Sequence, residues 1–274
     1  YLYNSTGVFQ NNIFFGDLVT GFIVATIVSV VIFGGIKRIA LVASRMVPVM
    51  VGIYLIAAII VISKNFQLVP GIFSLIVTDA FSGNAVAGGA IGSMISIGVR
   101  RGLFSNEAGS GTETMAHGAA KTKEPVREGL VAMLGPLIDT IIVCSITAVV
   151  ILLSGVYTQD LNGVSMTVAA FENQLGLFGK ILIMIAVVTF SLSTMFGYSY
   201  YGRKCTSYLF GTKWKQAYNL FYVAMIIVAS TISIDIAINF MDSAFALMVI
   251  PTMIATILLA PHVINESRKY FKKI

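Results

Sequence analysis

Long apolar runs dominate the chain, and they constrain its fold more than any other feature. Seven runs are apolar over close to the 20 or so residues that a helix needs to cross a bilayer. They are Gly16–Phe33, Val42–Ser63, Asn84–Val99, Leu130–Ser154, Ile181–Tyr201, Tyr218–Ile238 and Ser243–Ile264. We therefore predict an all-α polytopic membrane protein in which residues 1–274 form a single transmembrane domain.

The composition supports a bilayer as the solvent. Hydrophobic residues make up 57% of the chain and charged residues 11%, whereas a soluble domain carries about 25% charged residues. The net charge of +6 does not indicate nucleic-acid binding, because the lysines and arginines form short clusters between the apolar runs. The two cysteines show no metal-binding spacing.

The distribution of basic residues predicts the orientation. With the N-terminus outside, every lysine and arginine except Lys64 and Lys180 lies on the inner side, as the positive-inside rule requires. We expect a multi-pass protein of the cytoplasmic membrane with its C-terminus inside. Because the chain opens at Tyr1 without a methionine or a signal peptide, we also expect further helices upstream.

The third run is short and rich in glycine, with Gly88, Gly89, Gly92 and Gly98. Glycines weaken a helix by about 1 kcal/mol each relative to alanine, and transporters use broken helices to expose backbone groups to a ligand. Small residues also allow close helix packing, and Gly88–Gly92 matches the GxxxG pattern. Both interpretations stay open at this point.

Oxygen-bearing side chains inside the runs are candidate ion ligands. Asp139 lies within the fourth run beside Thr140, and an intramembrane carboxylate usually faces a cavity or a partner. Ser191, Ser193 and Thr194 form a hydroxyl cluster in the fifth run. Each group can bind a small cation such as Na⁺, and each can instead hydrogen-bond to a neighbouring helix.

The inner segment Arg100–Arg127 is too long for a simple turn. Its glycines suggest a folded gate region, and Ser105 or Asn106 can cap a turn that follows. Glu107 and His117 match no metal or protease spacing, so we expect no catalysis there. The outer segment Tyr157–Lys180 is also long, and its stretch Met166–Gln174 can form a short surface helix.

The run Gly102-Leu-Phe-Ser-Asn-Glu-Ala-Gly-Ser-Gly111 resembles the signature of the alanine or glycine:cation symporter family. The resemblance extends over nearly the whole chain. It continues through Ala116–Lys121, Pro125–Met133, Ile138–Cys144, Thr189–Thr194, Gly197–Gly202, Tyr208–Gly211, Met248–Pro251 and Ser267–Phe271.

The resemblance implies the leucine-transporter-like fold, with two inverted five-helix repeats. The seven runs would be core helices four to ten, and the first three would be missing. The third run would be the broken helix at the substrate site, which implies substrate contacts at Gly88, Gly89, Ile91, Gly92 and Ser93. The cluster Ser191, Ser193 and Thr194 would bind Na⁺, and Asp139 would lie near a second ion site.

The implied function is symport of a small neutral amino acid, alanine or glycine, with Na⁺ across the bilayer. We expect no cofactor, no nucleic-acid partner and no chemical change in the substrate. Three alternatives stay open: proton coupling through Asp139 or another substrate with the same fold, a membrane-embedded enzyme, and a truncated fragment that does not transport. The enzyme is disfavoured because, apart from Asp17, Arg45 and His262 near the ends of their runs, Asp139 and Asp235 are the only acidic or basic residues within the runs.

Overall fold

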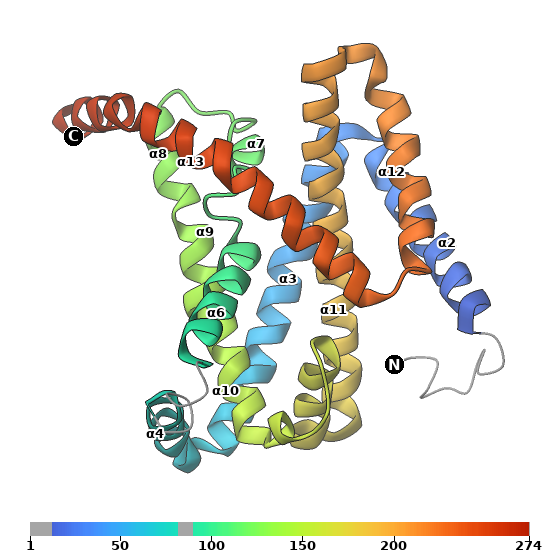
Figure 1. Cartoon of the computed structure of the whole chain (residues 1–274), viewed down its shortest axis with the longest axis vertical. Helices are drawn as coiled ribbons and strands as arrows, with labels where there is room; N and C mark the ends of the chain where they lie inside the picture. The colour runs from blue at the N-terminus through green and yellow to red at the C-terminus, as the bar shows by residue number, and fades with distance from the viewer. Residues whose placement is uncertain (1–12, 82–89, 274) are drawn as a thin grey trace. The chain divides into compact units, whose positions relative to one another are not determined.

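A computed structural model describes residues 13–81 and 90–273, and this part of the chain is almost entirely helical (Figure 1). It contains no strand. The helices of the first half are α2 (Ile13–Ile32), α3 (Gly35–Lys64), η1 (Phe66–Leu68), α4 (Val69–Ala80), α6 (Ala90–Asn106), α7 (Glu113–His117), α8 (Pro125–Ala132), α9 (Leu134–Pro136) and η2 (Leu137–Cys144). The second half holds α10 (Ser145–Ser154), η3 (Val156–Thr158), α11 (Val164–Phe210), η4 (Thr212–Trp214), α12 (Lys215–Ser230) and α13 (Ile234–Lys273).

Five of these helices are long and apolar enough to cross a membrane. They are Phe14–Ile32, Gly35–Lys64, Pro125–Ser154, Val164–Phe210 and Ile234–Lys273. The fold class, an all-α polytopic membrane protein, is therefore confirmed. The inverted repeat, the missing helices and the single domain stay predictions.

Two of the seven predicted spans correspond to shorter helices. The third span is covered by α6, which has 17 residues, and Gly88 and Gly89 lie outside the described residues. The sixth, Tyr218–Ile238, is divided between α12, which has 16 residues and ends at Ser230, and the start of α13 at Ile234. The Thr231 hydroxyl donates a hydrogen bond to the Val228 carbonyl at 2.8 Å, and such local bonds compete with helix continuation.

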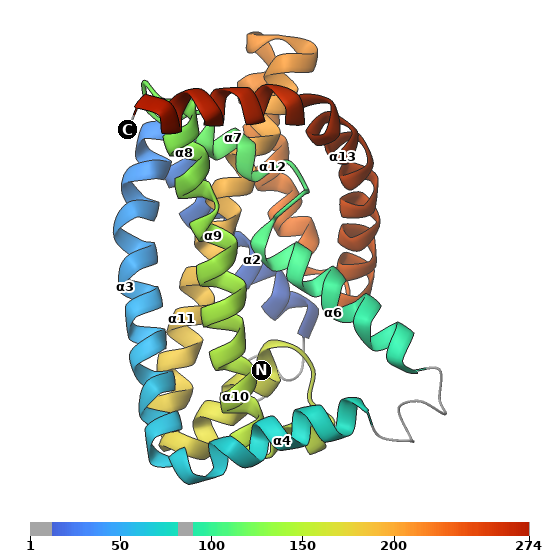
Figure 2. The same cartoon turned by 90° about the vertical axis from the view of Figure 1, so that its left-hand side faces the viewer.

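The segments predicted to lie outside also contain helices. The helix expected near Met166–Gln174 is present as the first part of α11, which breaks at Gly176, where φ is 65° and ψ is −153°. It is not a surface helix, because Val168, Ala170 and Phe171 are buried. An apolar helix over Phe66–Ala80 was not expected from the sequence. Its main part, α4, leaves the C-terminal end of α3 at a wide angle (Figure 2).

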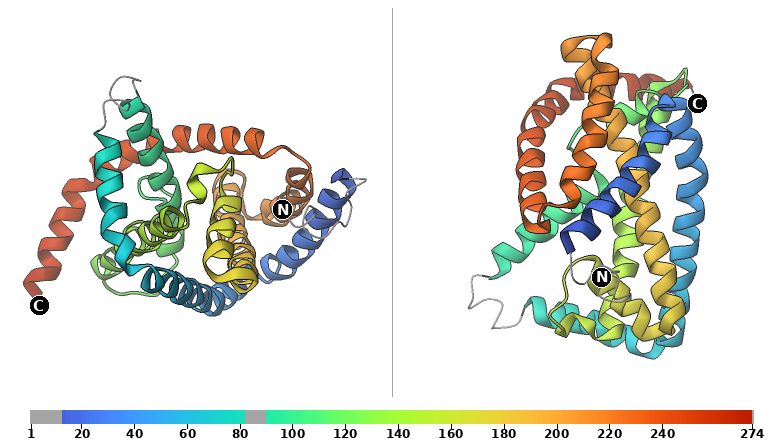
Figure 3. Two further views of the ribbon diagram at one scale, coloured as in Figure 1. Left: turned by 90° about the horizontal axis from the view of Figure 1, so that it is seen from below. Right: turned by 90° about the vertical axis from the view of Figure 1, so that its right-hand side faces the viewer.

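The chain divides into two compact units. Unit 1 comprises residues 1–56, 162–172 and 176–241, and unit 2 comprises residues 57–161, 173–175 and 242–274. Within unit 1, α2 packs along α12 (Figure 3). A β-carbon on Gly21 of α2 would lie 2.8 Å from the Ser230 Cβ of α12, so only glycine permits this approach.

The core of unit 1 joins α2, α3 and α11. Its buried side chains are Val28, Val31, Ile32, Ile39, Phe196 and Tyr200. The Tyr222 hydroxyl of α12 donates to the Met195 carbonyl of α11 at 2.9 Å, which ties the fourth helix to this core.

Unit 2 contains two irregular helices. Residues Leu137–Cys144 form a π-helix, η2, between α9 and α10, and π-helical turns occur frequently at functional sites. Helix α13 bends along its length (Figure 2) and contains Pro251 and Pro261. Each proline lacks the N–H that a straight helix needs, which accounts for the bend.

Candidate functional site

The signature run Gly102–Gly111 begins in the last turns of α6 and continues into a tight loop, here called the signature loop (residues 107–112), between α6 and α7. Glu107, Gly109 and Gly111 have left-handed backbones, with φ of 56°, 81° and 85°. Glycine adopts this conformation without strain, whereas glutamate does so rarely. The Asn106 side chain accepts a hydrogen bond from the Ala108 N–H at 2.9 Å, which confirms the predicted cap.

Buried hydroxyl groups hold the signature loop together. Ser110 and Thr112 are each 3% exposed. The Ser110 hydroxyl donates to the Glu107 carbonyl at 2.6 Å, and the Thr112 hydroxyl donates to the Glu107 carboxylate at 2.5 Å. Hydrogen bonds to a charged acceptor are stronger than neutral ones. The left-handed backbone of Glu107 is therefore held by bonds to both its main chain and its side chain.

The signature loop is joined to α13. The Thr252 hydroxyl donates to the Ser110 carbonyl at 3.1 Å, a bond that it shares with the Met248 carbonyl of its own helix. A β-carbon on Gly111 would lie 2.8 Å from the Thr252 Oγ1. Gly111 therefore meets two requirements at once, a left-handed backbone and close contact with α13.

Asp139 lies on the π-helix η2 and contacts the end of α6. Its Oδ2 accepts a hydrogen bond from the Ser105 hydroxyl at 2.6 Å. The next residue, Thr140, accepts one from the Asn106 side-chain amide at 2.9 Å. Two consecutive residues of η2 thus bind two consecutive residues of α6. This is the interhelical bonding that the sequence left open for Asp139, and its role as an ion ligand stays a prediction.

The predicted hydroxyl cluster lies on α11 in unit 1. The Ser193 hydroxyl donates to the Phe190 carbonyl at 2.8 Å, which leaves its lone pairs available to a cation. Ser191 and Thr194 are exposed. The cluster and Asp139 belong to different units.

Part of the predicted substrate site lies on α6. Ile91, Gly92 and Ser93 are in the first turn of this helix. A β-carbon on Gly92 would meet no atom within 4 Å, so packing within unit 2 does not explain this glycine. Gly88 and Gly89 are outside the described residues, and the expected helix break stays a prediction.

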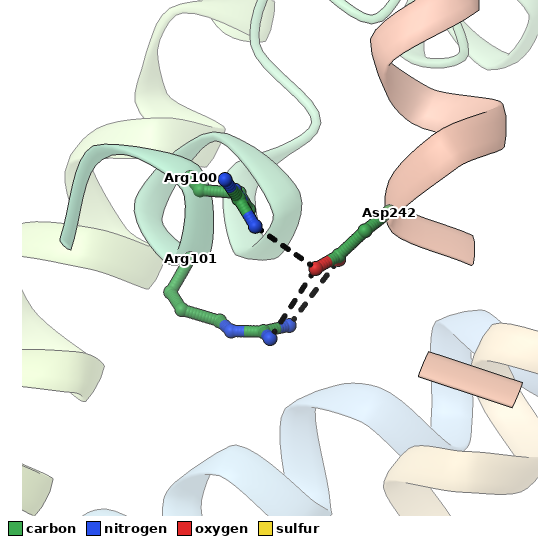
Figure 4. Close-up of polar contacts among 3 residues, drawn as sticks. All are labelled: Arg100, Arg101 and Asp242. Atoms are coloured by element: carbon green, nitrogen blue, oxygen red, sulfur yellow. Dashed lines mark hydrogen bonds and ion pairs between the residues drawn. The ribbon is translucent and has the colours of Figure 1, made fainter. Parts of the chain in front are cut away.

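Sequence reasoning missed an ionic cluster between α6 and α13, here called the Arg–Asp cluster (Arg100, Arg101 and Asp242; Figure 4). The Asp242 carboxylate lies 3.4 Å from an Arg101 nitrogen and 3.6 Å from an Arg100 nitrogen. The two arginines indicated only an inner loop, and Asp242 fell one residue before the last predicted span. No local pattern links residues about 140 positions apart.

Glu107 and His117, considered above as an acid–base pair, bind other groups. His117 Nδ1 lies 2.7 Å from the Glu128 carboxylate, and Glu107 binds Thr112. Among the described residues, no group of three or more His, Cys, Asp or Glu side chains is placed to hold a metal ion.

Glu113, in the first turn of α7, provides a pH-dependent prediction. Burial raises the pKa of its carboxyl group above the ordinary value of 4.5; nearby His117 opposes this rise and Glu107 adds to it. The folded state thus binds this proton more tightly than the unfolded state. The free energy of unfolding therefore falls as the pH rises from the unfolded-state pKa through the folded-state pKa. We expect Glu113→Gln to raise the melting temperature at pH 7 and to have no effect below pH 4.5. A lower melting temperature at pH 7 would contradict this.

The described helices define an all-α polytopic membrane protein. Over residues 2–274 the chain matches the model of the sodium:alanine symporter family, and it belongs to that family. The resemblance carried by the residues around Gly102–Gly111 is therefore confirmed.

Characterised and uncharacterised transporters are among its relatives. The chain is 38% identical to the sodium/alanine symporter AgcS of Methanococcus maripaludis, over 92% of the chain and 56% of the relative. It is 37% identical to an uncharacterized transporter of Haemophilus influenzae, over 94% and 58%. A protein of Bacillus subtilis named "Probable sodium/glutamine symporter GlnT" is 35% identical over 97% and 56%. The chain thus spans about half the length of these curated relatives.

Proposed function

We propose that the protein containing this chain couples the uptake of a small neutral amino acid, alanine or glycine, to Na⁺ across the cytoplasmic membrane. The family match over residues 2–274 carries this proposal. The relative named a sodium/alanine symporter supports the cargo and the ion. The substrate crosses unchanged, so the protein is not an enzyme and needs no cofactor besides the coupling ion.

The proposed substrate site is the first turn of α6. A helix break before Ala90, as the family resemblance implies, would leave the N–H groups of the first turn of α6 without partners in the helix. These N–H groups and the helix dipole favour a carboxylate, which every amino acid carries. Gly88, Gly89, Ile91, Gly92 and Ser93 would provide small walls that exclude large side chains.

The proposed sodium ligands are Ser191, Ser193 and Thr194, with Asp139 near a second ion site. Hydroxyl and carboxylate oxygens suit a hard cation such as Na⁺. If Na⁺ and the amino acid both favour the same conformation, each raises the affinity for the other. This reciprocity is the physical basis of coupling, and it requires no chemical step.

Proton coupling through Asp139 is the second candidate. Its carboxylate already accepts a short hydrogen bond of 2.6 Å from Ser105, and a proton on this group would turn an acceptor into a donor. A change in protonation would then alter the contact between η2 and α6.

Uptake by the full-length protein in proteoliposomes separates the candidates. We expect an inward Na⁺ gradient to drive uptake of labelled alanine, and replacement of Na⁺ by choline to abolish it. Uptake that persists in choline and follows the pH gradient would reject sodium coupling. Excess unlabelled glycine should compete with alanine; competition by glutamine alone would reject the proposed cargo.

A further inference from the structure

Helix α6 and the signature loop contact α13 at three points, which follow the same order along both segments. The contacts are the Arg–Asp cluster, the Phe104–Phe245 ring pair with centroids 4.7 Å apart, and the Ser110–Thr252 hydrogen bond at 3.1 Å. On α13 the first and last contacts are ten residues apart, about 15 Å at a rise of about 1.5 Å per residue. The three contacts are therefore spread along α13 and can be tested separately.

The contact at the signature loop is neutral, buried and closely fitted. Ser110 is 3% exposed, and its carbonyl accepts the Thr252 hydroxyl. Gly111 has no room for a β-carbon against Thr252. Separating these groups would leave a buried carbonyl unpaired, which costs about 1–3 kcal/mol. This end of the contact is therefore fixed.

The contact at the Arg–Asp cluster is charged, long and partly solvated. The nitrogen–oxygen distances are 3.4 Å and 3.6 Å, and the arginine side chains are 50% and 58% exposed. Exposed ion pairs contribute little, about 0–1 kcal/mol. Asp242 differs, since its side chain is only 15% exposed, so its carboxylate has little access to water and depends on the two guanidinium groups (Figure 4). The arginines can turn to water when this contact separates, whereas Asp242 cannot, so this end is held through the Asp242 carboxylate.

We propose that Asp242 is the positioning residue for α6, and that α6 pivots about the signature loop when the Arg–Asp cluster separates. The inference rests on the proposed function, in which the first turn of α6 binds the substrate. Arg101 lies five residues and Ala90 sixteen residues before Asn106, about 7.5 Å and about 24 Å along the helix. A displacement at Arg101 is therefore about three times larger at the substrate end.

Asp242→Asn in the full-length protein tests this role. Without the carboxylate, α6 spends less time in the position that binds substrate, and the apparent affinity falls by that fraction. If that position falls to about one fifth occupancy, the KM for alanine rises about fivefold. We expect this rise with Vmax per transporter nearly unchanged. A purely structural defect would lower Vmax with the amount of folded protein and leave KM unaltered.

A charge swap and a matched control complete the experiment. Asp242→Arg combined with Arg100→Asp and Arg101→Asp reverses every charge of the cluster and keeps opposite charges at each contact, so it should restore the KM. Asp235→Asn makes the same change on the same helix, at an exposed residue with no ion pair in the described part of the chain. Its KM should match the wild type. An Asp242→Asn protein with wild-type KM would overturn the proposal, and if that variant fails to fold, Arg101→Gln and the charge swap decide instead.

A second readout does not depend on transport. Phe104→Cys and Phe245→Cys, with Cys144 and Cys205 replaced by serine, place two thiols where the rings now touch. A short bifunctional thiol reagent should link them, and the yield should fall when Asp242→Asn is added. An unchanged yield would show that Asp242 does not hold α6. If the wild-type protein does not take up alanine, the proposed function fails, and this crosslinking result alone decides the role of Asp242.

Discussion

Replacing Gly111 by alanine should destabilise the protein more than any other single methyl addition in the signature loop. The backbone has a φ of 85°, and a left-handed conformation costs an alanine about 1–2 kcal/mol. The new methyl group would also lie 2.8 Å from the Thr252 Oγ1, and overpacking of this kind costs about 1–3 kcal/mol. The melting temperature of the purified full-length protein should fall accordingly.

Gly109→Ala is the matched control for this prediction. Its φ of 81° carries the same backbone cost, but its β-carbon would meet only the Met253 sulfur at 3.9 Å. The difference between the two variants therefore measures the contact with Thr252. Thr252→Ala removes both the clashing Oγ1 and the hydrogen bond to Ser110, so it should cost less stability in the Gly111→Ala background than in the wild type. If Gly111→Ala and Gly109→Ala lower the melting temperature equally, the signature loop does not pack tightly against α13.

The double variant Ser193→Ala, Thr194→Ala should weaken the response to sodium more than any other change on α11. Each substitution removes a hydroxyl oxygen from the proposed site, while the helix keeps its backbone bonds. We expect the Na⁺ concentration for half-maximal alanine uptake to rise at least about tenfold, which corresponds to about 1.4 kcal/mol. Uptake by the full-length protein, measured against Na⁺ at a fixed alanine concentration, provides the value.

Ser199→Ala separates ion binding from helix stability. Ser199 donates to the Phe196 carbonyl at 2.7 Å, as Ser193 does to Phe190, but it is buried at 2% exposure. Its loss should affect stability and leave the sodium dependence unchanged. If the Ser193 and Thr194 variant retains the wild-type sodium dependence, the ion site does not lie at these hydroxyls.

Much of the fold could be predicted because bilayer insertion depends on local composition. A run such as Val42–Ser63 must be helical in hydrocarbon, since its backbone has no other hydrogen-bond partners there. Helix ends were less predictable. One span was predicted over Tyr218–Ile238, whereas α12 ends at Ser230 and α13 begins at Ile234. Helix α4 was missed because its 12 residues are too few to span.

The candidate site was only partly predictable. Its signature residues stand in one continuous segment, so the loop could be singled out from Gly102–Gly111 and the family inferred from it. Asp242 could not be connected to Arg101, because the partner of a charged residue on a distant helix has no fixed spacing. The same limit applied to Ser105 and Asp139, whose bond joins α6 to the π-helix η2.

The sequence by itself determined that this chain is a helical membrane protein of the sodium:alanine symporter family, since spans and family motifs are written in consecutive residues. Only the tertiary structure decided why the signature has its glycines, with Gly111 pressed against Thr252 on α13. It also decided which charges meet on α6 and α13. The physical reason is that side-chain contacts depend on how separate helices pack, and packing is not encoded at a regular interval along the chain.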